Sequence, residues 1–223
     1  MKLLFSDVYT ADPDSPGHAK KINIATDGET ITYVGEEIPE GKFDRTIKGN
    51  YLVMPGFYNA HCHSAMTLFR GLGGDLPLKR WLDEAILPAE DRLDPGLVKL
   101  SSLAAIAEMI ASGTVSFSDM YFFCESTAEA VLESGIKANI SRSVVSFDEN
   151  ESPSDNFRVA EAVDLFKGWN KAGDGRIKVD FSLHAEYTNT PAMCEYLAEL
   201  AHKYDAGMQI HLSETEDEHL RCI

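Results

Sequence analysis

An alternation of strand-like and helix-like segments, which starts after Pro55 and runs through the rest of the sequence, constrains the fold more than any other feature. The strand-like runs cover residues 51–60, 114–118, 136–145, 177–184 and 207–213. Helix-like segments lie between them, and this order of elements is typical of a parallel sheet covered by helices. We therefore predict an α/β fold with about five parallel strands.

One of the helices has clear ends in the sequence. Asp94 suits the N-cap, Pro95 suits the first helical position, and Gly113 follows the last apolar residue. We expect one apolar stripe of this helix to pack on the sheet. The stripe consists of Leu97, Leu100, Leu103, Ala104, Ala107, Ile110 and Ala111.

Residues 1–50 have a different pattern. Short alternating runs at 21–25 and 30–35 are separated by turn-forming residues such as Asp27-Gly28. Such runs predict a few short strands joined by turns, and hence a small β domain ahead of the alternating part.

Charge and cysteine content exclude several classes of protein. The 36 acidic and 20 basic residues give a formal charge of -16, which argues against nucleic acids and anionic membrane surfaces as partners. No apolar run reaches the length of a membrane span, and the N-terminus does not resemble an export signal. The cysteines form no C-x-x-C pair, so we predict neither a disulfide framework nor a thiolate zinc site. They are Cys62, Cys124, Cys194 and Cys222. We expect a soluble, cytoplasmic protein.

The last two predicted strands have one apolar and one polar face. In 177–184, Val179, Phe181 and Leu183 share one face, and Asp180, Ser182 and His184 share the other. Residues 207–213 show the same division. A strand of a parallel α/β sheet is normally apolar on both faces. A barrel explains the difference, because helices cover its outer face while polar side chains line a site at the carboxyl ends of its strands.

Histidines lie at several of these predicted strand ends. His61 and His63 point to the same side of an extended segment and can therefore meet one metal ion, and His211 can be a third ligand. Alternatives remain open, because H-x-H alone is a weak pattern and His211 can be a hydrogen-bonded core histidine. Glu214 can move protons beside a metal site, or it can belong to an acidic run that opens a helix. Asp119 is expected to be a structural carboxylate at a strand end.

Longer motifs make the chain resemble the amidohydrolase superfamily. They are VMPGFYNAHCH at 53–63, MTLFRG at 66–71, WL at 81–82, PAEDR at 88–92, DMYF at 119–122, LH at 183–184 and HLSET at 211–215. Within the superfamily, the chain is most similar to the branch of methylthioadenosine/S-adenosylhomocysteine deaminases and chlorohydrolases. The resemblance implies a partial (β/α)8 TIM-type barrel with about five strands, preceded by part of a small β-sandwich domain. Residues 1–52 would be the N-terminal part of the small β domain, and residues 53–223 the first half of the metal-dependent hydrolase barrel.

The resemblance also implies a set of site residues. His61, His63 and His211 would bind one divalent metal ion, zinc or iron, and Glu214 would shuttle the proton. Glu90 would accept hydrogen bonds from ribose hydroxyls. His184 would lie near the purine and ribose.

Two arginines are implied as further substrate contacts. Arg142 and Arg158 would reach the 5′ substituent of the substrate. Each substrate contact has an alternative: Glu90 can belong to a solvated charge cluster, and Arg142 can project toward a helix and pair with a carboxylate.

The family pattern contains two further metal-site residues and three further strands that these 223 residues do not include. We therefore interpret the chain as the N-terminal half of a deaminase, with a complementing C-terminal half or a homo-oligomer as partner. The expected activity is hydrolytic deamination of an adenosine-type nucleoside: methylthioadenosine, S-adenosylhomocysteine or adenosine. One alternative is an aminohydrolase or chlorohydrolase acting on guanine, a triazine or a related amino-heterocycle. Another is an inactive half-barrel that acts only by association.

Overall fold

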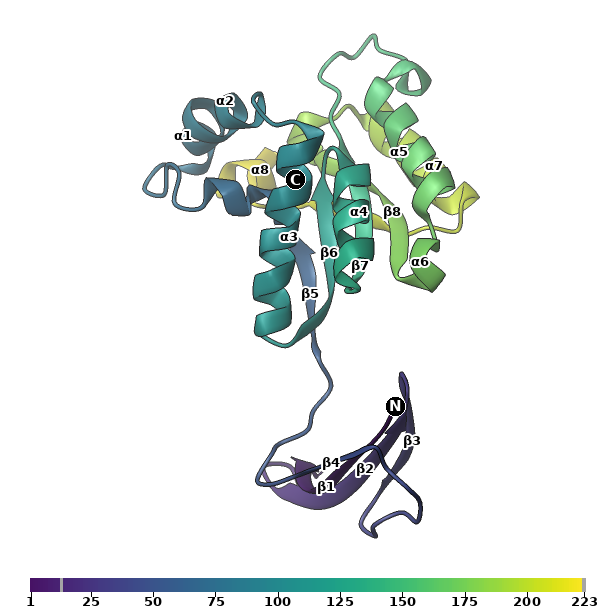
Figure 1. The fold of residues 1–223 in the computed structure, drawn as a ribbon. Helices are drawn as coiled ribbons and strands as arrows, with labels where there is room; N and C mark the ends of the chain where they lie inside the picture. Colours follow the sequence, from purple (N-terminus) through teal and green to yellow (C-terminus); the bar gives the residue numbers. More distant parts are fainter. Residues whose placement is uncertain (13, 222–223) are drawn as a thin grey trace. The chain divides into compact units, whose positions relative to one another are not determined.

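The computed structural model describes residues 1–12 and 14–221. The chain divides after Gly56 into two compact units (Figure 1). Within the described ranges, no helix combines the length and apolarity that a membrane crossing requires. The thiols of Cys62, Cys124 and Cys194 are free, and Cys222 lies outside the described residues.

The first unit is a four-stranded sheet with the order β3-β2-β1-β4. Its strands are β1 (Lys2–Ala11), β2 (Ala19–Asp27), β3 (Thr30–Gly35) and β4 (Arg45–Lys48). Strands β1, β2 and β3 pair antiparallel, while β4 runs parallel to β1. Val8, Ile22 and Ile24 form its buried core. The separate small β domain expected from the sequence is therefore present.

The segment that the sequence predicted as one strand at 51–60 belongs to both units. Val53 packs against the core of the small sheet, and its N–H donates to the carbonyl oxygen of Tyr9 at 2.7 Å. The strand of the second unit starts only at Phe57. Proline has no N–H for a strand ladder, and so Pro55 with Gly56 interrupts the pairing. Residues 53–56, which the sequence-based division assigned to the barrel, thus lie in the first unit.

The second unit contains a five-stranded sheet with the order β5-β6-β7-β8-β9, and all neighbouring strands are parallel. The strands are β5 (Phe57–Cys62), β6 (Thr114–Tyr121), β7 (Lys137–Val144), β8 (Ile177–Ala185) and β9 (Met208–His211). Sequential strand order in a parallel sheet is the arrangement of a (β/α)8 barrel. The predicted α/β class and the five parallel strands are confirmed.

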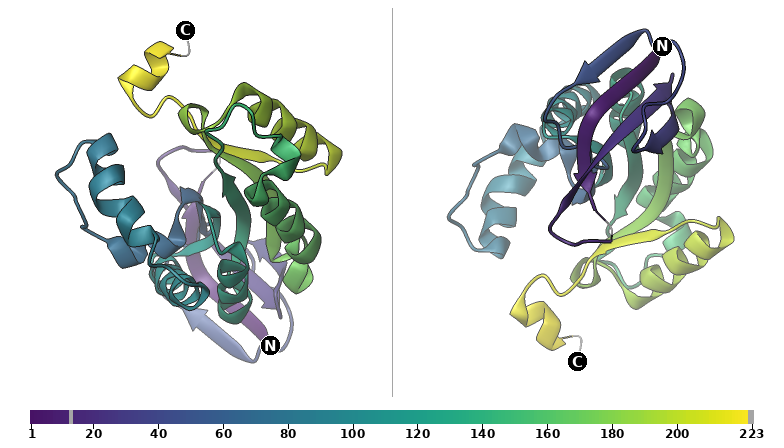
Figure 2. Two further views of the ribbon diagram at one scale, coloured as in Figure 1. Left: turned by 90° about the horizontal axis from the view of Figure 1, so that it is seen from above. Right: turned by 90° about the horizontal axis from the view of Figure 1, so that it is seen from below.

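Four long helices connect these strands: α3 (Pro95–Ala111), α4 (Cys124–Ser134), α5 (Phe157–Trp169) and α7 (Pro191–Lys203). In Figure 2 they lie outside the curved sheet. The predicted cap of α3 is present, since Asp94 Oδ1 accepts a hydrogen bond from the Leu97 N–H at 2.8 Å. Thr190 caps α7 in the same way, through the Met193 N–H at 3.2 Å.

Shorter elements occupy the connections at the carboxyl ends of the strands and elsewhere. They are η1 (Ser64–Phe69), α1 (Leu78–Trp81), η2 (Leu82–Ile86), α2 (Leu87–Glu90), η3 (Pro153–Asp155), α6 (Ala172–Gly175), η4 (Glu186–Thr188) and α8 (Glu216–Arg221). Two of them lie next to predicted site residues: α2 ends at Glu90, and α8 begins two residues after Glu214.

The core of the second unit lies between the sheet and its long helices. One cluster includes Ile140 and Val179 with Leu165 of α5, and a second includes Phe181 with Met193 and Leu197 of α7. Burial of each such side chain contributes about 1.5–3 kcal/mol to folding. The apolar face predicted for 177–184 is therefore the face that the helices cover.

The face of α3 that was predicted to be buried is wrong, because the structure buries a different face of this helix. Its buried residues are Val98, Ser101, Ser102, Ala105 and Ile106, whereas Leu100 is 66% exposed and Ile110 is 51% exposed. Small polar side chains of this face contact η1 and α4. Ser102 Oγ lies 3.1 Å from Ser64 Oγ and 3.3 Å from Thr127 Oγ1. Leucines on that face would keep the elements apart, so close packing outweighs the hydrophobic periodicity.

Candidate functional site

Three imidazoles meet at the carboxyl ends of the two edge strands of the second unit. His61 is in β5, His63 follows that strand, and His211 ends β9. The Nε2 atom of His211 lies 3.1 Å from the Nε2 atoms of both His61 and His63. Because β5 and β9 are opposite edges of the sheet, the meeting of their side chains requires strong curvature of the barrel kind.

The ring nitrogens of this cluster are arranged as metal ligands require. His63 Nδ1 hydrogen-bonds to the carbonyl oxygen of Met120, which leaves the lone pair on Nε2 to face the other rings. Burial lowers the pKa of His61, His63 and His211, and this favours the neutral, ligating form of each ring.

A cation fits this cluster better than hydrogen bonding does. One N–H on His211 can point at only one of its two neighbours, so hydrogen bonds alone leave part of the cluster unsatisfied. Tetrahedral zinc with Zn–N bonds of about 2.1 Å separates its nitrogen ligands by about 3.4 Å. The observed 3.1 Å separations are close to that spacing. Among the described residues, His61, His63 and His211 form the cluster able to hold a metal ion.

Glu214 lies close enough for its negative charge to raise the pKa of His61, His63 and His211, against the lowering effect of burial. Its backbone N–H donates to Glu218 Oε2 at 2.9 Å. Glu218 also receives the Thr215 N–H, and Thr215 Oγ1 accepts the Glu218 N–H, both at 3.2 Å. This capping arrangement starts α8 and fixes the backbone at Glu214. The T-x-x-E spacing at 215–218 could have identified it in the sequence.

His184 lies beside the cluster, on the inner side that strand alternation predicted. Its ring centroid is 5.0 Å from that of His211, and its Nδ1 lies 3.1 Å from Thr188 Oγ1. Burial, followed by the neighbouring His211 and His63, lowers its pKa to about 4. The ring is therefore neutral near pH 7 and can both donate and accept hydrogen bonds.

The Glu90 carboxylate is partly buried and does not belong to a solvated charge cluster. Its Oε1 accepts a hydrogen bond from the Tyr121 hydroxyl at 2.6 Å. Burial raises the pKa of Glu90, and the bond from Tyr121 acts in the opposite direction. The Tyr121 ring is 6.0 Å from that of His63. Sequence reasoning did not single out Tyr121, which lies in the quoted DMYF motif.

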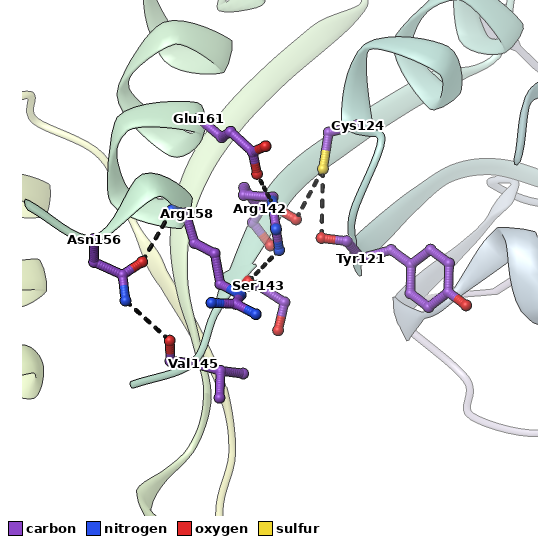
Figure 3. A network of polar contacts seen from close by, with 9 residues as sticks. Tyr121, Cys124, Arg142, Ser143, Val145, Asn156, Arg158 and Glu161 are labelled. Atoms are coloured by element: carbon purple, nitrogen blue, oxygen red, sulfur yellow. Dashed lines mark hydrogen bonds and ion pairs between the residues drawn. The ribbon is translucent and has the colours of Figure 1, made fainter. Parts of the chain in front are cut away.

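The two predicted arginines lie next to each other but have different environments (Figure 3). Arg142 of β7 is 11% exposed at its side chain, and its Nε donates to Glu161 Oε2 of α5 at 2.6 Å. Its side chain thus makes the ion pair that the sequence allowed as an alternative. No described carboxylate pairs with the Arg158 guanidinium, which stacks on Phe157 at 4.4 Å. Burial and the charge of Arg142 lower the pKa of Arg158.

Arg158 borders a hollow at the carboxyl end of β7. The lining also includes Ser146, Phe147, Glu151 and Asn156. Asn156 holds the start of α5, because its Oδ1 accepts the Arg158 N–H at 2.9 Å and its Nδ2 donates to the Val145 carbonyl oxygen at 3.1 Å. The loop thus presents a cation without a carboxylate partner at the end of the sheet that carries the histidines.

Asp119 of β6 holds the backbone around His63 in place. It is completely buried, its Oδ1 accepts the Ser64 N–H at 2.6 Å, and the Cys62 thiol lies 3.6 Å from the same oxygen. Cys62 and Asp119 are also partners in the β5–β6 pairing. The carboxylate therefore holds the residues on both sides of His63 against β6. Burial raises its pKa.

Comparison with known proteins accounts for this arrangement. The model of the amidohydrolase family matches residues 52–223. The chain belongs to the amidohydrolase family. This amidohydrolase is 38% identical over 219 residues to a 5-methylthioadenosine/S-adenosylhomocysteine deaminase of Caldanaerobacter subterraneus subsp. tengcongensis, an alignment that covers 98% of the chain and 50% of the relative. It is 42% identical over 192 residues to a 5'-deoxyadenosine deaminase of Methanobrevibacter smithii, with 85% and 43% covered. The resemblance predicted from the motifs is confirmed.

A solved structure extends the comparison to the fold. The amidohydrolase chain superimposes on a zinc-containing crystal structure of an adenosine deaminase from Xanthomonas campestris with a TM-score of 0.82 and 30% sequence identity. The superposition covers 97% of this chain and 50% of that one. The chain likewise spans about half the length of the curated relatives it matches. The partial barrel predicted from the sequence is thus confirmed.

Proposed function

We propose that this amidohydrolase contributes a metal site and a nucleoside site to a hydrolytic deaminase of adenosine-type substrates. Methylthioadenosine, S-adenosylhomocysteine and adenosine are the proposed substrates. The observation that carries the proposal is the convergence of three imidazole Nε2 atoms near Glu214, with those of His61 and His63 each 3.1 Å from that of His211. The names of the relatives, which are deaminases of this substrate class, support the choice of reaction.

His61, His63 and His211 would hold one divalent metal ion. Zinc is our first choice because three imidazoles suit it and because the adenosine deaminase from Xanthomonas campestris contains zinc. Iron is the alternative, since imidazole also suits iron. When bound, the ion would supply Lewis-acid activation of the attacking water.

Glu214 would move the protons of the reaction. A carboxylate beside the reacting centre can carry one proton of the attacking water to the ring nitrogen and then its second proton to the departing amine, which leaves as ammonia. The hydrogen bonds from the Glu214 and Thr215 N–H groups to Glu218 hold the backbone that carries this carboxylate. Ammonia and an inosine-type nucleoside would be the products.

Three further residues would bind the nucleoside. Glu90 would accept the ribose hydroxyls, and the neutral ring of His184 would hydrogen-bond near the purine and ribose. Arg158 would reach the 5′ substituent, because its guanidinium lacks a carboxylate partner within the described part of the chain. Arg142, which is paired with Glu161, would contribute its charge nearby.

The test uses the zinc-loaded chain together with a complementing C-terminal half, because the chain spans about half the length of its curated relatives. It follows the ultraviolet absorbance change from adenosine-type to inosine-type nucleosides. We expect conversion of at least one of the three substrates and one zinc ion per molecule by elemental analysis. His211→Ala should lose both zinc and activity. His202→Ala is the matched control, because His202 is an exposed histidine of α7. A zinc-loaded protein that converts none of the three nucleosides contradicts the proposal.

A further inference from the structure

We propose that Tyr121 is a positioning residue that sets the place and charge of Glu90 and thereby selects substrates that carry ribose hydroxyls. This inference rests on the proposed function, because it assigns Glu90 to the ribose. Tyr121 itself is assigned no contact with the reacting atoms. Its action passes through one hydrogen bond to Glu90 Oε1, 2.6 Å long.

Tyr121 is held rigidly from several sides. It is the last residue of β6 and is 5% exposed, packed in a cluster with Ala65 and Val98. Its ring stacks on Phe122 with a centroid separation of 4.2 Å. The Cys124 thiol lies 3.5 Å from the Tyr121 carbonyl oxygen, and the ring points away from the arginine pair in Figure 3. A side chain fixed in this way can impose its position on a partner.

Glu90 needs such a partner. It is the last residue of α2, at the end of the continuous helical run that α1 and η2 begin, and the backbone hydrogen bonds of a helix do not fix the rotamer of a glutamate side chain. A glutamate has three rotatable bonds, and ordering them costs free energy that a fixed donor offsets. Among the described residues Tyr121 supplies the hydrogen bond to this carboxylate, at Oε1, and Oε2 remains able to accept from a ligand.

The same tyrosine lies between the two ends of the proposed substrate site. One side of its ring approaches the His63 ring, at 6.0 Å between centroids, while its hydroxyl binds Glu90. The histidine cluster and the Glu90 carboxylate are therefore held at a separation that one rigid aromatic side chain defines. A nucleoside has a comparable division, with the reacting ring carbon at one end and the ribose hydroxyls at the other.

The hydroxyl also affects the charge of Glu90. Burial raises the pKa of the carboxyl group, and the hydrogen bond from Tyr121 stabilises the ionised form that accepts two hydroxyls best. Loss of the Tyr121 hydroxyl would therefore leave the Glu90 carboxylate less well oriented and its ionised form less stable.

Tyr121→Phe keeps the ring and its packing and removes only the hydroxyl. In the zinc-loaded chain with its complementing C-terminal half we expect KM for adenosine to rise about tenfold with kcat nearly unchanged, as for loss of one hydrogen bond to a charged group. With 2′,3′-dideoxyadenosine, which lacks the ribose hydroxyls, kcat/KM should be unchanged. Tyr196→Phe is the matched control, because Tyr196 lies on α7 away from the site and should leave both substrates unaffected.

The second substrate separates positioning from a general structural effect. An equal loss of kcat/KM for both nucleosides, or no loss for either, overturns the inference and leaves the proposed function intact. In the Glu90→Ala background, which lacks the group that the Tyr121 hydroxyl positions, Tyr121→Phe should have no further effect on adenosine, and a fully additive effect also overturns the inference. A zinc-loaded wild-type protein without deaminase activity overturns the proposed function and the inference together.

Discussion

The histidine end and the arginine end of the candidate site differ in how far the protein satisfies its own polar groups. At the histidine end, three Nε2 atoms face one another with no acidic hydrogen-bond partner between them. At the arginine end, Arg142 is neutralised by Glu161 at 2.6 Å, and only Arg158 lacks a carboxylate. Unsatisfied polar groups that converge indicate a ligand, whereas a completed ion pair indicates a structural role. The comparison therefore separates predicted site residues that look equivalent in the sequence.

The largest effect is expected at the histidine end. Glu214→Gln should lower kcat by about 10²–10⁴-fold, because the amide cannot transfer the proton, while the zinc content stays the same. The measurement is steady-state deamination together with elemental analysis. Glu216→Gln is the control, since it removes an exposed carboxylate of the same acidic run. A kcat near that of the wild type would assign Glu214 to the helix start alone.

The support beneath the histidines should have the next largest effect. Asp119→Ala removes the acceptor of the Ser64 N–H and should weaken zinc binding by about 10–100-fold in a competition titration with a chelator. Asp119→Asn keeps an acceptor oxygen and should lie between Asp119→Ala and the wild type. Asp164→Asn, on the exposed face of α5, should leave the affinity unchanged. Equal zinc affinity in all four proteins would show that this carboxylate does not support the ligands.

Two variants can distinguish the substrate-binding role proposed for Arg158 from the ion-pairing role of Arg142. Arg158→Met should raise KM for S-adenosylhomocysteine about tenfold and leave methylthioadenosine unaffected, because only the first substrate carries a carboxylate on its 5′ substituent. Arg142→Met should instead lower the midpoint of urea unfolding, since it breaks the ion pair with Glu161. If Arg142→Met has the substrate-specific effect and Arg158→Met does not, the two assignments must be exchanged.

The smallest effect concerns pH and His184. Its pKa of about 4 in the folded protein lies below the ordinary value near 6.5, so the unfolded chain binds more protons between these values. The stability that the neutral ring contributes is complete above about pH 6.5 and is lost as the pH falls toward 4. The slope should not exceed about 1.4 kcal/mol per pH unit in the metal-free protein. Unfolding measured across this range should be less pH-dependent in His184→Asn, and an unchanged slope would assign it to other groups.

Local signals in the sequence were sufficient for the ends of several elements. Asp94 caps its helix as predicted, because an N-cap hydrogen bond joins residues only three positions apart. The alternation in 177–184 correctly separated the helix-facing from the inner side chains of β8, since the two faces of a strand follow directly from its geometry.

Signals that depend on neighbours in space were misread or missed. Leu100 was expected inside, but α3 turns Ser102 and Ala105 inward, because the distance to η1 and α4 decides which face fits. The sequence likewise did not show that the predicted strand at 51–60 is interrupted at Pro55, or that Val53 packs on the small sheet.

By itself, the sequence determined the α/β class, the caps and the identity of the residues that can ligate a metal, because composition, spacing and alternation act over a few positions. Only the tertiary structure decided which of them meet. His61 and His211 are 150 positions apart, yet their Nε2 atoms lie 3.1 Å from each other because the sheet curves between its edge strands. It also decided that Arg142 faces Glu161 and that Glu90 rests on Tyr121, since each contact joins side chains from different elements whose packing no local pattern encodes.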